Sequence, residues 1–137
     1  MSQSFLIPLL CVALAGCATN TPSNQAVVTG ESSYLERIAV PPGTRFEAVL
    51  EDVSLADAAA VRIGQSVIEN AGQPPYRFSI AYDPSQIIAN HSYAVRTSLR
   101  IDDRLLFIST TNTPVITRDN PVDVRIVMQK ISIPNMP

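Results

Sequence analysis

The fold is decided by the stretch Tyr93-Ala94-Val95-Arg96-Thr97-Ser98-Leu99-Arg100-Ile101, where large or β-branched residues alternate with small or basic ones. A period of two places successive side chains on opposite faces of a strand. Residues 76–82 and 122–129 alternate in the same way. We therefore expect half-buried β-strands in these three places.

Four further segments alternate less cleanly and bring the expected number of strands to about seven. They are residues 34–40, 46–53, 61–68 and 105–110. Pro, Gly, Asp and Asn gather between the segments, as in Pro41-Pro42-Gly43 and Asp102-Asp103, and such residues favour turns. The Ala-rich segment 56–60 is too short for more than a turn. The pattern predicts an all-β fold, an antiparallel β-sandwich of about seven strands.

Gly64 interrupts the expected strand 61–68 and allows two interpretations. A glycine within a strand often marks a β-bulge or a close approach of another backbone. We favour the bulge. The alternative is a sheet edge that accepts a partner strand or helix.

The N-terminal segment has the pattern of a secretory signal. An apolar run from Phe5 to Ala15 contains Pro8 and is far shorter than the roughly 20 residues that a membrane-spanning helix needs. It ends in Leu14-Ala15-Gly16-Cys17, which resembles the lipobox of bacterial lipoproteins. The resemblance implies recognition of Leu14, Ala15 and Gly16 by the signal peptidase, cleavage before Cys17 and lipidation of that cysteine.

The same resemblance implies a location. Ala18 follows the cysteine where an Asp would signal retention at the inner membrane, so we expect an outer-membrane lipoprotein facing the periplasm and held by its lipid. Met1 to Phe5 carry no Lys or Arg, so either the signal is weak or the true start lies upstream.

Four regions are expected along the chain. They are the signal peptide (1–16), the lipidated cysteine with a flexible tether (17–33), the β-sandwich domain (34–133) and a short tail (134–137). Cys11 would be removed with the signal and Cys17 acylated, which leaves no thiol in the mature domain. The net charge is −2 and the basic residues are scattered singly, so nucleic-acid binding is not expected.

No catalytic or metal constellation stands out in the sequence, and we expect no enzyme activity and no cofactor. His91 is the only histidine, and we interpret it as part of a loop rather than a general base. A zinc site would need more ligands of this kind. Glu47, Glu51 and Arg45 would share a strand face as a solvated charge row, with Asp52 on the other face.

Four ordered blocks resemble one known family. They are Glu36-Arg37-Ile38-Ala39-Val40-Pro41-Pro42-Gly43, Leu50-Glu51-Asp52-Val53-Ser54-Leu55-Ala56-Asp57, Tyr82-Asp83-Pro84 and His91-Ser92-Tyr93-Ala94-Val95-Arg96. Together they resemble the YbaY/YscW lipoproteins across about residues 34–131. The resemblance implies a compact β-sandwich on an outer-membrane lipoprotein, and in the type III secretion branch it implies a pilotin, which helps a secretin reach and assemble in the outer membrane.

The expected function is therefore a non-enzymatic binding or assembly module whose client is unknown, and the resemblance implies an outer-membrane protein such as a secretin as that client. One alternative is a small-ligand carrier, which would need a cavity of about 300 Å³ or more lined by Phe46, Phe78 or Phe107. Another is an envelope hydrolase, which would need polar side chains converging on His91 or the carboxylates.

Overall fold

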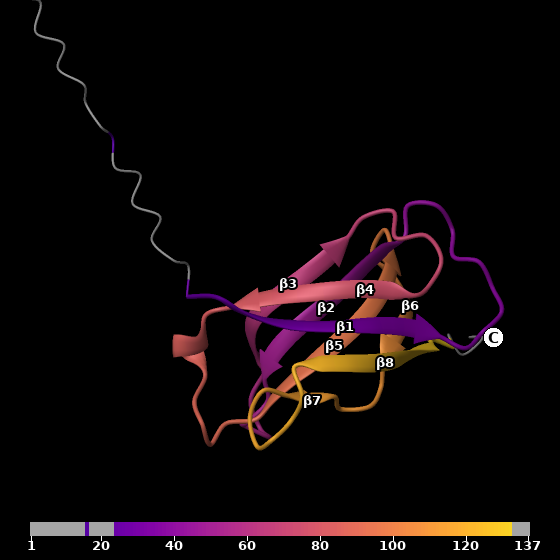
Figure 1. The fold of residues 1–137 in the computed structure, drawn as a ribbon. Coiled ribbons are helices and arrows are strands. Elements are labelled where there is room, and N and C mark those ends of the chain that lie inside the picture. Colours follow the sequence, from indigo (N-terminus) through magenta and orange to yellow (C-terminus); the bar gives the residue numbers. More distant parts are fainter. Residues whose placement is uncertain (1–15, 17–23, 133–137) are drawn as a thin grey trace, which may run out of the picture.

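The computed structural model describes Gly16 and residues 24–132, and it confirms the all-β fold (Figure 1). The expected signal peptide up to Ala15, Cys17 and the tail 134–137 lie outside the described residues. One short 3-10 helix, η1 (Pro84–Gln86), accompanies eight strands. The strands are β1 (Ala26–Tyr34), β2 (Arg45–Asp52), β3 (Val61–Ile68), β4 (Tyr76–Tyr82), β5 (Tyr93–Ile101), β6 (Arg104–Ser109), β7 (Pro114–Val115) and β8 (Asp123–Lys130).

All eight strands belong to one sheet that curves around a shared core. Its order is β3-β2-β5-β6-β8-β1-β4, and β7 adds to β5. The strand pairs are antiparallel except for β1 and β8, which run parallel with Thr29 opposite Asp123 and Tyr34 opposite Met128. The predicted antiparallel arrangement is confirmed for the other strand pairs, and the β1–β8 pair departs from it because β1, the first strand, lies between β4 and the last strand, β8.

The boundary between tether and domain was predicted wrongly. Residues 26–33, expected in the flexible tether, form most of β1. The sequence of this strand does not alternate clearly between apolar and polar residues, because two of its inward positions are Gly30 and Ser32, which carry no apolar side chain. Ser32 is nonetheless fully buried, and its hydroxyl pairs with that of Thr97 at 3.0 Å. The expected tether therefore shortens to 17–25.

Two smaller differences concern the connections. Residues 35–40, expected to continue a strand from Tyr34, are an irregular connection with Leu35 to Ala39 exposed. The two-residue strand β7 was missed because it is too short to show any alternation. The remaining expected strands are confirmed to within two residues at each end.

Aromatic rings fill the space inside the curved sheet. Phe46 stacks on Tyr76 with ring centroids 5.0 Å apart, and Tyr34 stacks on Phe107 at 4.3 Å. Phe46, Phe78 and Phe107 are each at most 5% exposed, so the rings expected to line a ligand cavity are themselves core residues. Gly30 makes room for this packing, because a Cβ there would lie 2.5 Å from both Phe78 Cζ and the carbonyl oxygen of Val124.

The edge strands β3 and β4 face each other at a seam where the sheet nearly closes. The register between β2 and β3 shifts beside Gly64, so Leu50 pairs with Gly64 and Glu51 with Arg62, which is the β-bulge favoured from the sequence. A Cβ on Gly64 would lie 2.7 Å from the carbonyl oxygen of Ala81 on β4. The glycine therefore also permits a close backbone approach across the seam.

Candidate functional site

The strand directions sort the connections into two ends of the barrel. The chain enters β1 at one end, which we call the tether end, and the segments 53–60, 83–92 and 110–122 lie there as well. The opposite end, the far end, carries the connections 35–44 and 69–75, the tight turn Asp102-Asp103 and the exit from β8. Each end has one group of residues that qualifies as a candidate site.

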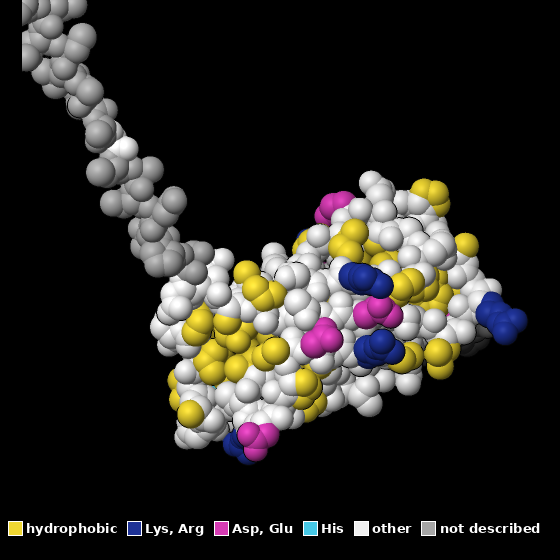
Figure 2. Space-filling model, viewed as in Figure 1, with side chains coloured by type: hydrophobic (Ala, Val, Ile, Leu, Met, Phe, Trp, Pro, Cys, Tyr) yellow, Lys and Arg dark blue, Asp and Glu magenta, His cyan; other side chains and the backbone are white. Residues whose placement is uncertain are grey.

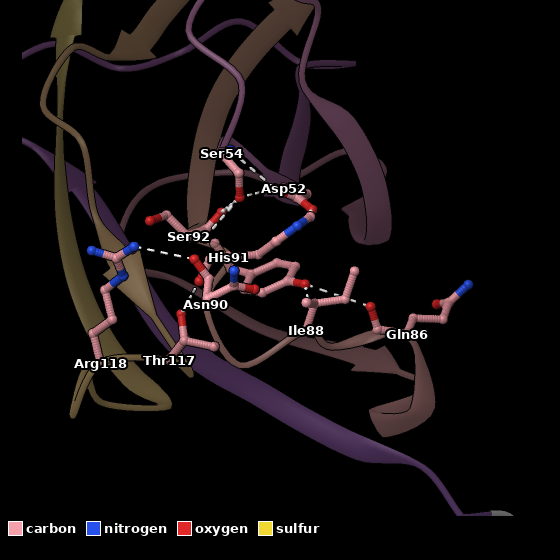
Figure 3. A network of polar contacts seen from close by, with 10 residues as sticks. Asp52, Ser54, Gln86, Ile88, Asn90, His91, Ser92, Thr117 and Arg118 are labelled. Carbon is pink, nitrogen blue, oxygen red and sulfur yellow. Dashed lines mark hydrogen bonds and ion pairs between the residues drawn. The ribbon is translucent and has the colours of Figure 1, made fainter.

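A polar network at the tether end connects three segments that are distant in the sequence (Figure 3). His91 Nδ1 lies 2.7 Å from Asp52 Oδ2, at the end of β2. The other oxygen of Asp52 accepts hydrogen bonds from the backbone N–H of Ser54 at 3.0 Å and from its hydroxyl at 2.5 Å. The Thr117 hydroxyl donates to the His91 carbonyl at 2.6 Å, which ties the third segment to the other two.

The geometry of this network differs from that of a serine hydrolase. Such an enzyme needs the serine hydroxyl to donate to the histidine that removes its proton. Here the Ser54 hydroxyl donates to Asp52, and the Ser54 oxygen accepts the Ser92 N–H at 2.8 Å. The network therefore holds the loops in place, which agrees with the loop role expected for His91. Among the described residues no group of three His, Cys, Asp or Glu side chains is placed to hold a metal ion.

Asp52 is ionised more readily than an ordinary aspartate. Burial opposes its charge, but the hydrogen bonds from Ser54 and His91 outweigh burial and hold the pKa of its carboxyl below the usual range. A carboxyl with a lowered pKa in the folded state stabilises the fold above its unfolded pKa of about 4, and this stabilisation is lost as the pH falls through the lower, folded value.

We predict that Asp52→Asn lowers the free energy of unfolding at pH 7 by about 1–2 kcal/mol, because the uncharged amide loses charge-assisted hydrogen bonds. The gap between wild type and variant should shrink as the pH falls below about 4, where the wild-type carboxyl also becomes neutral. Urea unfolding at several pH values measures this gap. Asp57→Asn, in an exposed turn, is the control. A difference in unfolding free energy that does not depend on pH would contradict the lowered pKa of Asp52.

The tether end also contains strained backbone beside a shallow cleft. Ile116 has φ = 72° and Arg118 has φ = 58°, in the left-handed region that β-branched residues in particular avoid. The cleft has a volume of about 520 Å³ and is lined by Tyr82, Pro84, Ile87, Ala89, Ile116, Thr117, Arg118 and Asp119. Figure 2 shows hydrophobic side chains gathered over this end of the molecule.

The charge row expected on β2 is present on the outer face of the sheet. Glu47 lies 3.5 Å from Arg45 and 3.8 Å from Arg62, and Glu51 lies 3.8 Å from Arg96. The Arg45–Glu47 pair lies within β2, and the other two pairs connect β2 to its neighbours β3 and β5. Partly solvated ion pairs of this kind contribute little to stability. Glu47 and Glu51 are thus each paired with a basic side chain.

A narrower apolar slot lies at the far end. Ile38, Ala39, Val40 and Pro41 form one wall, and Leu105, Leu106 and Phe107 of β6 form the other, with Arg104, Lys130 and Ile131 at the rim. Its volume is about 200 Å³. A second hollow, between Leu35 and the end of β8, also includes Lys130. The two hollows together make the far-end groove.

The sequence singled out neither site. His91 and Asp52 are 39 positions apart, and only the pairing of β2 with β5 brings the segment before Tyr93 next to the end of β2. The far-end groove joins residues of three separate segments. Leu35 and Ile38 lie in a region that was predicted as a strand, and 81% and 44% of their surface is exposed.

These features define a small domain made of one curved β-sheet, with a barrel-like core and apolar hollows at both ends. Comparison with known proteins then gives the family. The model of the type III secretion system lipoprotein chaperone (YscW) matches residues 23–128, and the chain belongs to this family. The match begins close to β1, in agreement with the corrected domain boundary.

Two relatives illustrate the range of the similarity. An alternative pilotin from the type II secretion system of Vibrio cholerae has a similar structure, with a TM-score of 0.75 and 35% identity over 79% of this chain and 98% of that one. The uncharacterized lipoprotein YbaY of Escherichia coli (strain K12) is 29% identical over 121 residues, or 85% of this chain. The chain spans 64% of the length of that lipoprotein.

Proposed function

We propose that the protein is a non-enzymatic, lipid-anchored chaperone that brings an outer-membrane client, such as a secretin, to its place of assembly. The observation that carries the proposal is the agreement of two comparisons: a lipoprotein chaperone family covers almost the whole domain, and the similar Vibrio cholerae structure is a pilotin. The Asp52–His91 contact joins one loop to the end of β2, and this structural role supports a mode of action through surface contact.

The proposed mechanism has two parts. Lipid on Cys17 would fix the protein to the periplasmic side of the outer membrane. β1 starts at Ala26, so the stretch from Cys17 to the domain is short; as a flexible linker it would have a root-mean-square length of about 15–18 Å. A client bound to the domain would then be concentrated at the membrane surface, where it has to assemble.

Deletion of the gene tests the proposal. In a strain that produces a secretin, we expect deletion to move that secretin from the outer-membrane to the inner-membrane fraction of a density gradient and to reduce its assembled multimers. A plasmid copy of the wild-type gene should restore both. An unchanged distribution of every secretin of the strain would contradict the proposal.

A further inference from the structure

We propose that the far-end groove holds an extended or helical peptide of the client that carries a large apolar side chain flanked by acidic residues. This inference rests on the proposed function and assigns a surface to it. The slot between Ile38 and Leu106, with about 200 Å³, has room for one large aliphatic or aromatic side chain. A side chain that fills such a pocket supplies much of the affinity in many interfaces.

The wall formed by residues 38–41 is fixed before any partner arrives. The Tyr34 hydroxyl donates to the carbonyl of Ile38 at 2.9 Å, and the Thr44 hydroxyl donates to the carbonyl of Pro41 at 2.7 Å. Val40 is buried, and the ring of Tyr34 is stacked on Phe107 below the slot. A preformed wall lowers the ordering cost of binding.

A β-bulge shapes the opposite wall. Leu99 pairs with Phe107 and Arg100 with Leu105, so Leu106 is the extra residue of β6. As a result the two consecutive leucines are both only half-buried and both line the slot. A regular strand would have placed one of them on each face of the sheet.

The rim of the slot is positively charged. Arg104 and Lys130 are exposed, they flank the apolar lining, and neither forms an ion pair with any residue in 24–132. The slot lining contains no acidic residue. Figure 2 shows hydrophobic side chains at the end where β1 and β8 finish, with Lys and Arg side chains close by. This charge selects acidic residues beside the apolar anchor.

The position of the groove also suits a client better than the cleft at the tether end. That cleft adjoins the start of β1, since Ala26 pairs with Tyr82, so the expected lipid anchor lies on its side of the domain. Its charged lining residues, Arg118 and Asp119, are of opposite sign. The far-end groove opens away from the anchor. Both charged residues that line its slot, Arg104 and Lys130, are basic, and Glu36 lies in the second hollow, outside the slot.

Selection from a library of short random peptides displayed on phage, against the purified domain, tests the inference. We expect enriched peptides to combine a large apolar residue with Asp or Glu and to shift the amide resonances of residues 35–40 and 104–107. Ile38→Asp should weaken the binding of the best synthetic peptide by about tenfold or more. The double variant Arg104→Glu with Lys130→Glu should have an effect of the same size. All three side chains are exposed, so the variants should fold.

Matched controls lie elsewhere on the surface. Leu55→Asp introduces the same charge at an exposed apolar residue of the tether end, and Arg125→Glu reverses an exposed cation on the outer face of β8. Neither should change the affinity by more than about twofold. Enrichment of basic peptides, shifts confined to residues 83–92 and 116–119, or no enrichment at all would overturn the inference. A positive gene-deletion result with a negative peptide result would remove the groove assignment and leave the proposed function.

Discussion

Gly30→Ala should lower the free energy of unfolding by about 3 kcal/mol, the upper end of what overpacking a core costs. A single added methyl group would lie 2.5 Å from Phe78 Cζ and 2.5 Å from the carbonyl oxygen of Val124. A turn of the Phe78 ring could relieve the first contact. The second contact is with backbone of β8, so β1 and β8 would have to move apart and weaken their parallel pairing.

Urea unfolding followed by circular dichroism measures this loss, and a variant too unstable to purify would show it as well. The matched control is Ser33→Val, which adds a larger side chain on the outer face of the same strand, opposite the half-exposed Val127. It should change the stability by no more than about 0.5 kcal/mol. A loss below about 1 kcal/mol for Gly30→Ala would show that β1 does not pack as described.

Cys17→Ser should move nearly all of the protein from the membrane fraction to the soluble fraction of broken cells. The serine hydroxyl cannot receive the lipid, and each buried CH₂ group of an acyl chain contributes about 0.8 kcal/mol to membrane binding. The described residues include no helix long and apolar enough to span a bilayer. Ultracentrifugation and immunoblotting measure the distribution, and mass spectrometry of the N-terminal peptide detects the acyl groups.

Cys11→Ser is the control for the anchor, because this cysteine lies in the segment that cleavage would remove. It should leave the protein in the membrane fraction. Membrane association of the Cys17→Ser variant would contradict the anchor. If the Cys17→Ser variant is soluble and folded but no longer supports secretin assembly, the lipid is needed in addition to the folded domain.

The strands with clear alternation could be predicted from the sequence because their own residues decide their faces. In β4 the pattern Tyr76, Phe78, Ile80 and Tyr82 is buried at every second position, as the sequence indicates. The strand β1 could not be predicted in this way. Its inward residues Gly30 and Ser32 fit the core because of their neighbours: Phe78 on the paired strand β4 fills the space beside Gly30, and Thr97 hydrogen-bonds to Ser32. These neighbours are brought close only by the formation of the sheet.

The sites depend even more on contacts between distant segments. Asp52 was assigned to a strand face and His91 to a loop, and both assignments hold, but their 2.7 Å contact follows from the pairing of β2 with β5. The far-end groove depends on the bulge at Leu106 and on the hydroxyl of Tyr34, which fixes the segment 38–41. Hydrophobic periodicity carries no information about either.

The parallel pairing of β1 with β8 makes the domain depend on its last strand. As the chain is made from its N-terminus, β1 can pair with β4 on one side once residue 82 is present. The other edge of β1, and one edge of β6, have no partner until residues 123–130 form β8. Such non-local contacts slow folding. A chain delivered across a membrane from its N-terminus would therefore not complete its sheet until the last strand had crossed. A copy truncated before Asp123 would leave the edges of β1 and β6 unpaired, and unpaired strand edges promote aggregation.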